Sequence, residues 1–358
     1  MLIVDAHLDL AWNALQWNRD LTRPVHSIRT MEGGVPGKGR GLGTVALPDL
    51  QRGRVALCFA TLLARSTGAH VPHIDYPSPT QSNAVARGQL AYYRALERQG
   101  HARVISTRPA FAAHMAAWER WEADPAGEPP PVGMVISMEG ADPILDPEEL
   151  EEWRELGLRI VGPAHYGPGR YAGGTATEAP LTELGRALLG EMGRLGIALD
   201  VTHLSDPAFW EAIERFDGPL LASHNNCRTL VPHQRQFSDE QLRAVIDRGG
   251  VIGAALDTWM LQPGWTVGAP NNPPVPLERV AEHIDHICQL AGSSRHAAIG
   301  SDLDGGFGRE QSPHDLDTIA DLQRLAELLA RRGYGDADIA AIMHGNWLRL
   351  LETILDQQ

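Results

Sequence analysis

Residues 4–10 read VDAHLDL, an apolar stretch that polar side chains interrupt. Side chains two positions apart point to the same face of a β-strand, so His7 and Asp9 share one face. A carboxylate buried in an apolar core without a partner is costly in free energy. The pair therefore lies either at a strand end that faces water or beside a bound cation.

Seven further short apolar stretches follow this one and alternate with helical patterns. With the first, they cover residues 2–10, 54–63, 132–140, 158–165, 197–205, 219–226, 250–257 and 296–305. Helices are predicted at 83–99, 109–121, 147–156, 181–195, 207–215, 239–248, 277–291, 316–331 and 336–355. This alternation predicts an α/β fold, a (β/α)8 TIM barrel. We find no internal repeat or linker, so residues 1–358 are expected to form one barrel domain, with irregular loops at 31–48 and 123–131.

Composition and charge exclude several classes of protein. The chain has 45 acidic and 31 basic residues, a formal net charge of −14, and no basic run of the kind that nucleic-acid binding requires. Three cysteines are too few for a disulfide framework, which fits a reducing compartment. We see no signal peptide and no apolar run near the ~20 residues of a membrane span. The sequence therefore predicts a cytoplasmic protein without a membrane or nucleic-acid partner.

Acidic and histidine side chains occupy the carboxyl ends of six of the predicted strands. In a parallel barrel these ends meet at one mouth, where active sites of such barrels are built. One histidine at a strand end is more often structural than functional, but a set at matching ends is hard to explain by packing. The residues are His7, Asp9, Glu139, His165, His203, His224 and Asp302.

Neutral imidazoles and carboxylates are good ligands for zinc and similar divalent ions. The pair at the first strand plus Glu139 could form one site, and two further histidines plus the same glutamate could form a second. A carboxylate has two oxygens, so Glu139 could bridge two ions about 3.5–4 Å apart. A water molecule between such ions loses a proton readily and becomes a nucleophile.

Several motifs in this order resemble the renal (membrane) dipeptidase family of zinc peptidases, family M19, in the amidohydrolase superfamily. They are the opening His-x-Asp, LPDLQRGRVALCFA at 47–60, SMEGADP at 137–143, DVTHLS at 200–205, ASHNNCR at 222–228, IGSDLDG at 299–305 and HGNWLRLLE at 344–352. Many amidohydrolases instead open with His-x-His and bridge the metals through a carbamylated lysine. The only lysine here, Lys38, lies in a Gly-rich loop, so Glu139 fits the bridging role.

The resemblance implies a metalloprotease that hydrolyses a dipeptide with a free C-terminal carboxylate through a metal-bridging hydroxide. It implies two Zn²⁺ per chain. His7, Asp9 and Glu139 would hold one ion, and Glu139, His203 and His224 the other. His165 would contact the substrate carbonyl and Asp302 would transfer the proton. Arg235 would bind the substrate carboxylate. A homodimer is also implied, because the family often forms dimers.

Two segments depart from the family pattern. After His165 the chain reads YGPGRYAGG at 166–174, and AALDTW at 254–259 stands where a Val-Asn-Phe-type run is common. Asp257 lies near a position that is often aromatic, and Trp259 and Trp265 are placed to line the pocket mouth. Substrate specificity is therefore expected to differ. The alternatives are an amidohydrolase for another carboxylate-bearing amide or lactone, and a metal- or ligand-binding barrel without turnover.

Overall fold

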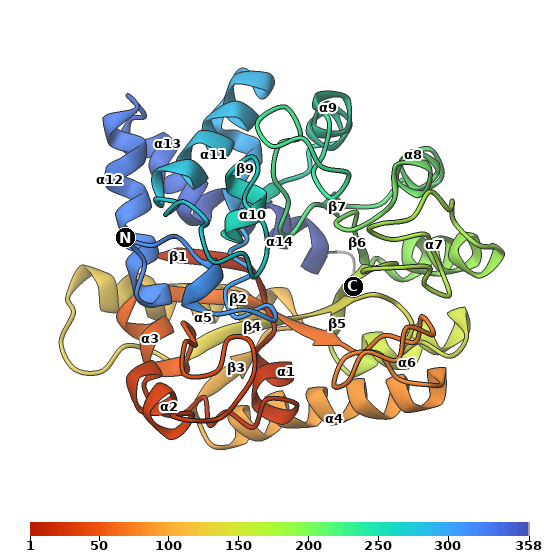
Figure 1. The fold of residues 1–358 in the computed structure, drawn as a ribbon, viewed down its shortest axis with the longest axis horizontal. Helices are drawn as coiled ribbons and strands as arrows, with labels where there is room; N and C mark the ends of the chain where they lie inside the picture. Colours follow the sequence, from red (N-terminus) through yellow and green to blue (C-terminus); the bar gives the residue numbers. More distant parts are fainter. Residues whose placement is uncertain (357–358) are drawn as a thin grey trace.

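Eight parallel strands form a nearly closed barrel in the computed structural model, which describes residues 1–356 (Figure 1). Their order is β7-β6-β5-β4-β2-β1-β9-β8. A parallel bridge between Ala222, just after β7, and Ile252 of β8 brings the two ends of this order side by side. All eight predicted strands are confirmed, although the last four are short. The strands are β1 (Ile3–Leu8), β2 (Val55–Leu63), β4 (Val132–Glu139), β5 (Leu158–Gly162), β6 (Ala198–Asp200), β7 (Leu220–Leu221), β8 (Ile252–Ala254) and β9 (Ala297–Ile299).

Helices surround the strands, and each predicted helical segment contains one (Figure 1). These are α4 (Pro79–Arg98), α5 (Arg108–Ala123), α6 (Leu150–Glu155), α7 (Glu183–Leu195), α8 (Asp206–Arg215), α9 (Asp239–Asp247), α11 (Glu278–Ala291), α12 (Arg324–Arg331), α13 (Asp336–Ala340) and α14 (Asn346–Asp356). A π-helical turn, Ala341–Gly345, joins the last two. Short 3-10 helices lie at Pro147–Glu149, Ser294–His296, Arg309–Gln311 and Ile319–Gln323.

The sequence analysis missed one strand and four short helices. Strand β3 (Ala102–Val104) pairs with the start of β4. The helices are α1 (Leu10–Leu15), α2 (Val25–Met31), α3 (Leu47–Arg52) and α10 (Thr258–Leu261). Each spans two turns or fewer, so its sequence carries too little periodicity to be recognised.

Local sequence signals explain where several helices begin and end. Ser238 and Gln241 form the reciprocal capping box at the start of α9, as their spacing predicts. The Thr182 side chain accepts a hydrogen bond from the Gly185 amide and caps α7. That helix ends at Gly196, whose φ of 66° lies in the left-handed region that glycine adopts without strain. These boundaries fix where the loops of the barrel mouth start.

The barrel interior is filled by apolar side chains at its amino end. Phe59 of β2 packs edge-on against Trp347 of α14, with ring centroids 5.2 Å apart. The Trp347 indole also donates a hydrogen bond to the Ile299 carbonyl at 2.8 Å, and His344 contacts the Leu2 carbonyl at 3.1 Å. The C-terminal helices therefore cover the amino ends of the strands, and the polar carboxyl ends face the opposite mouth.

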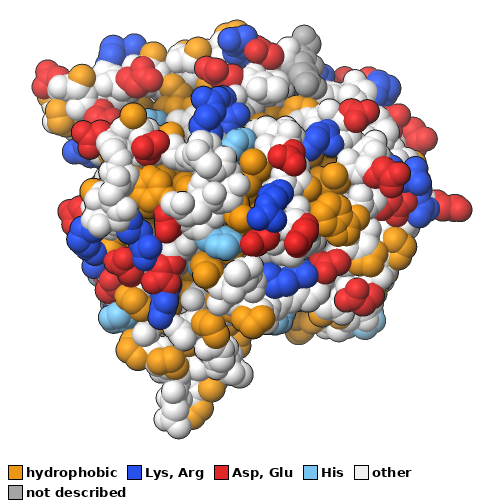
Figure 2. Space-filling view, turned by 90° about the horizontal axis from the view of Figure 1, so that it is seen from above, with side chains coloured by type: hydrophobic (Ala, Val, Ile, Leu, Met, Phe, Trp, Pro, Cys, Tyr) orange, Lys and Arg blue, Asp and Glu red, His pale blue; other side chains and the backbone are white. Residues whose placement is uncertain are grey.

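No described helix combines the length and the apolar character that a membrane span needs. On the face shown in Figure 2, Lys and Arg side chains are scattered among Asp and Glu rather than gathered into a basic patch. The three cysteines, Cys58, Cys227 and Cys288, are buried and free.

A buried ionic network joins the Gly-rich loop to the segment that follows β9. The Asp304 carboxylate accepts hydrogen bonds from the amide and hydroxyl of Thr44, both at 2.7 Å, and from the Val45 amide at 3.1 Å. Arg19 donates to the same carboxylate at 3.1 Å and also pairs with Glu32 at 2.9 Å. This network orders the loop beside the segment that carries Asp302.

We predict that Asp304→Asn destabilises the fold by roughly 3 kcal/mol, because it removes one partner of a buried ion pair. Denaturant unfolding followed by circular dichroism measures the change. The matched control is Asp20→Asn, since Asp20 forms an exposed pair with Arg23 whose loss costs less than about 1 kcal/mol. Equal midpoint shifts in the two variants would show that the network adds nothing to stability.

Candidate active site

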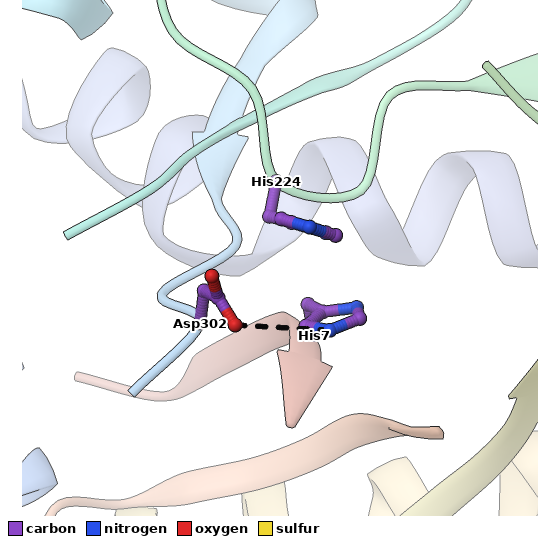
Figure 3. Close-up of side chains that lie close together, drawn as sticks. All are labelled: His7, His224 and Asp302. Carbon is purple, nitrogen blue, oxygen red and sulfur yellow. Dashed lines mark ion pairs between the residues drawn. The ribbon is translucent and has the colours of Figure 1, made fainter. Parts of the chain in front are cut away.

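The seven acid and histidine residues predicted at strand ends lie together at the mouth of the barrel. His7 and Glu139 are at the ends of β1 and β4, and the others follow β1, β5, β6, β7 and β9 directly. Figure 3 shows His7, His224 and Asp302 pointing toward one another from three segments that are distant in sequence. Arg235, from the loop between β7 and α9, lines the same pocket. The structure therefore brings together every residue that the sequence analysis singled out for this site.

The Glu139 carboxylate lies at the centre of the cluster. Its Oε2 is 3.6 Å from His7 Nε2, and its Oε1 is 3.1 Å from His203 Nε2 and 3.2 Å from His224 Nε2. Three sets of side chains place ligand atoms within 4.8 Å of one another: His7, Asp9 and Glu139; Glu139, His203 and His224; and His7, His224 and Asp302. The first two sets share Glu139, which is the geometry that a bridging carboxylate needs.

Hydroxyl groups orient the rings of the three clustered histidines. His203 Nδ1 lies 2.9 Å from the Thr175 hydroxyl, His224 Nδ1 lies 2.9 Å from the Ser223 hydroxyl, and His7 Nδ1 lies 3.4 Å from the Thr61 hydroxyl. Because the hydroxyl oxygens can accept from Nδ1–H, the Nε2 lone pair of each ring, which faces Glu139, is free to bind a metal ion.

The polar atoms of the cluster fit a bound cation better than they fit one another. His7 Nε2 and Asp9 Oδ1 are buried without a hydrogen-bond partner among residues 1–356. The Nε2 atoms of His203 and His224 are only 3.0 Å apart, so at most one of them can carry a hydrogen toward the other. A divalent ion bound to these atoms would satisfy lone pairs that the protein leaves unpaired.

Burial and neighbouring charges set the protonation of the histidines. Burial lowers the pKa of His203 and of His224 well below the usual value, and the Arg235 charge lowers both further. These rings are therefore neutral, as metal ligands must be. Burial also acts against protonation of His7, but Glu139, Asp9 and Asp302 raise its pKa to about 10. The acidic groups around His7 thus favour a positive charge at that position, which a metal ion would supply in place of the proton.

His165 is held by an arginine that the sequence analysis missed. The Arg65 guanidinium Nη1 lies 3.3 Å from His165 Nδ1, and because arginine can only donate, Nδ1 must accept. The ring proton is then on Nε2, which lies 3.8 Å from Glu139 Oε1 at the pocket wall. Asp75 lies 3.6 Å from Arg65 and balances its charge. Arg65 stands two residues beyond the second predicted strand, a position that could have drawn attention to it.

The mouth of the barrel holds a cavity of about 130 Å³ beside the cluster. This is small compared with the ~300–1,000 Å³ of pockets for drug-sized ligands, so it favours a small substrate. Arg235 is fixed there by hydrogen bonds to Asn225 Oδ1 at 2.6 Å and to the His224 carbonyl at 2.8 Å. The lining also includes Trp12, Leu63, Ile74, Tyr166, Asp257, Trp259 and Met260. Of the two tryptophans expected at the pocket mouth, Trp259 lines this cavity, whereas Trp265 lines a separate one.

Comparisons with known proteins agree on one family. The sequence profile of the family described as membrane dipeptidase (peptidase family M19) matches residues 1–358. The crystal structure of a metallopeptidase called dipeptidase AC superposes with a TM-score of 0.78 at 26% identity and covers 99% of both chains. A metallopeptidase from Rhodobacter sphaeroides, bound to a phosphinate mimic of the dipeptide L-Ala-D-Ala, gives a TM-score of 0.77 at 26% identity, again over 99% of both chains.

Comparison of the sequence with other proteins also finds relatives. A Klebsiella pneumoniae protein described as uncharacterized, from the region 5′ of pqqA, is 31% identical over 236 residues, which are 63% of this chain and 83% of that protein. An uncharacterized dipeptidase of Schizosaccharomyces pombe is 28% identical over 230 residues, which are 63% of this chain. The match spans about half of the fission yeast protein, 54% of its length.

We predict that His165 in the wild-type protein carries its ring proton on Nε2, and that Arg65→Met allows the other tautomer by removing the donor to Nδ1. Long-range ¹H–¹⁵N correlation spectra of histidine-labelled protein distinguish the two forms. Arg65→Lys is the matched control, because it keeps a positive donor at this position. A wild-type spectrum with the proton on Nδ1 would contradict the assignment.

Proposed function

Because the chain belongs to the membrane dipeptidase family of metallopeptidases, we propose that it hydrolyses dipeptides that carry a free C-terminal carboxylate. The observation that carries the proposal is the convergence of three histidine Nε2 atoms on one carboxylate, Glu139, beside a pocket that contains an oriented arginine. Such a cluster suits two metal ions, and the arginine suits a carboxylate-bearing substrate.

We propose that the metal ions are two Zn²⁺. His7, Asp9 and Glu139 would hold one ion, and Glu139, His203 and His224 the other. Bound in this way, the pair would acidify a shared water and polarise the scissile carbonyl. The buried atoms without partners and the neutral rings of His203 and His224 support this assignment.

The remaining residues act on the substrate itself. His165 would donate its Nε2–H to the carbonyl oxygen as negative charge develops there. Asp302 would accept a proton from the attacking water and deliver it to the leaving amine as the C–N bond breaks. Burial raises the pKa of Asp302 well above its usual range, His7 opposes this shift, and Asp9 and Glu139 add to it. A carboxylate whose pKa is raised in this way is a stronger base than an ordinary carboxylate, which suits proton acceptance from the attacking water.

A second candidate is the hydrolysis of another carboxylate-bearing amide or of a lactone. It is favoured by the pocket wall, where Tyr166 and Asp257 belong to the two segments that depart from the family pattern. Location in the cytoplasm, one barrel domain over 1–358 and a homodimer stay predictions from the sequence.

We predict that the zinc-loaded protein hydrolyses members of a dipeptide library that covers both stereochemistries, with L-Ala-D-Ala as one member. Asp302→Asn is expected to lower kcat by roughly 10²–10⁴-fold, because it removes the proton-transfer group. Ninhydrin detection of the released amino acids measures both rates.

The substrate panel also contains N-acyl amino acids and lactones. Turnover of these compounds without turnover of any dipeptide would contradict the dipeptidase proposal and support the second candidate. No hydrolysis at all, together with an unchanged ligand affinity in Asp302→Asn, would indicate a binding barrel without turnover.

We predict that Glu139→Ala lowers the metal content from two ions per chain to one or none, because both sites share this carboxylate. Activity is expected to fall by roughly a thousandfold with the loss of the metal contribution. Elemental analysis by mass spectrometry after dialysis gives the content, and circular dichroism verifies folding. Glu178→Ala, at an exposed position, is the control. Two ions in the Glu139→Ala variant would refute the bridging role.

A further inference from the structure

Asp257 is a pocket carboxylate that lies outside the candidate metal cluster. It follows β8, is the N-cap residue of α10 and is 6% exposed. Both of its oxygens accept hydrogen bonds from the Gln311 side-chain amide, at 2.9 and 2.8 Å, and the Trp259 amide lies 3.4 Å from Oδ1. Its position is therefore fixed by neutral donors, and its side chain lines the cavity beside Trp259.

The charge of Asp257 has no positive partner in the described part of the chain. Asp9, Glu139 and Asp302 each have an oxygen within 4 Å of His7 Nε2, whereas no arginine, lysine or histidine among residues 1–356 lies that close to Asp257. Burial raises the pKa of Asp257 to about 7, although the Gln311 hydrogen bonds and the more distant Lys38 charge act in the opposite direction. A cation that binds beside such a buried carboxylate stabilises its charged form.

The pocket wall around Asp257 suits an organic cation. Trp12, Tyr166 and Trp259 line the same cavity, and aromatic faces attract ammonium and guanidinium groups. Arg235 provides the positive group of the pocket, so opposite charges are presented to one ligand. A ligand with both a carboxylate and a cation would satisfy both side chains.

We propose that Asp257 forms a cation subsite and that the substrate is zwitterionic, with its carboxylate at Arg235 and an ammonium or guanidinium group at Asp257. The inference rests on the proposed hydrolysis of a carboxylate-bearing amide. The cation has two possible sources, the α-amino group of the substrate or a basic side chain.

The test compares Asp257→Asn with the parent protein, both in the zinc-loaded Asp302→Asn background, by calorimetric titration. This background measures affinity without turnover. The ligands are matched pairs: Ala-Lys against Ala-norleucine, Lys-Ala against norleucine-Ala, and Ala-Ala against its desamino analogue. Asp257→Asn is expected to weaken the binding of the cationic member of one pair by about tenfold or more, which is the range for a hydrogen bond to a charged group. The affinity for the neutral member of that pair should stay unchanged.

The pair that responds identifies the source of the cation: the desamino pair indicates the α-amino group, and a lysine pair indicates the side chain. Equal changes within every pair would overturn the subsite, because an uncharged role of Asp257 does not distinguish the members. Glu310→Gln, at the exposed residue beside Gln311, is the matched control and should alter no pair.

The outcome is separable from that of the proposed hydrolysis. If the wild-type protein cleaves none of the amides, but Asp257→Asn weakens the binding of the cationic ligands, the proposed function is contradicted and the subsite is supported. A protein that cleaves dipeptides with the same charge preference before and after the substitution contradicts the subsite alone.

Discussion

The contact between one buried carboxylate and three histidine nitrogens is the constraint on which the rest of the site depends. Glu139 is the last residue of β4, which pairs along its length with β2, so its place is fixed by the centre of the barrel wall. His203 and His224 reach it from the other side of the mouth, at 3.1 and 3.2 Å. Acceptor atoms this close together are stable only with protons or metal ions between them.

The protonation of the histidines follows from this arrangement. Burial, with a contribution from the Arg235 charge, holds His203 and His224 neutral, whereas His7 lies among three carboxylates. The backbone contributes as well, since His203 and Asp302 have positive φ values of 68° and 56°. Such conformations cost about 1–3 kcal/mol for residues other than glycine and are concentrated at functional sites. The hydroxyl groups and the Asp304 network hold these strained positions in place.

The strands, most helices and the clustered side chains could be predicted from the sequence because each depends on local pattern. Apolar stretches followed by His or Asp mark strand ends, and a parallel barrel brings those ends together whatever the loops do. The roles of Arg65 and Asp257 could not be predicted from such local patterns. The partner of Arg65 is 100 residues away and that of Asp257 is 54 residues away, so their roles depend on how separate loops pack.

The single lysine of the chain offers an experimental handle. Lys38 is exposed in the Gly-rich loop, with its ammonium group 6.0 Å from the centre of the Phe307 ring, on the same side of the molecule as Asp257. An amine-reactive fluorophore would therefore attach to one side chain only, besides the terminal amine, and would report from a groove that Lys38 lines together with Thr258, the residue after Asp257. The terminal amine pairs with Glu122 at 3.0 Å, and Glu122 belongs to α5, away from the mouth. Ligand entry could then be followed optically in the native sequence, without introducing a cysteine.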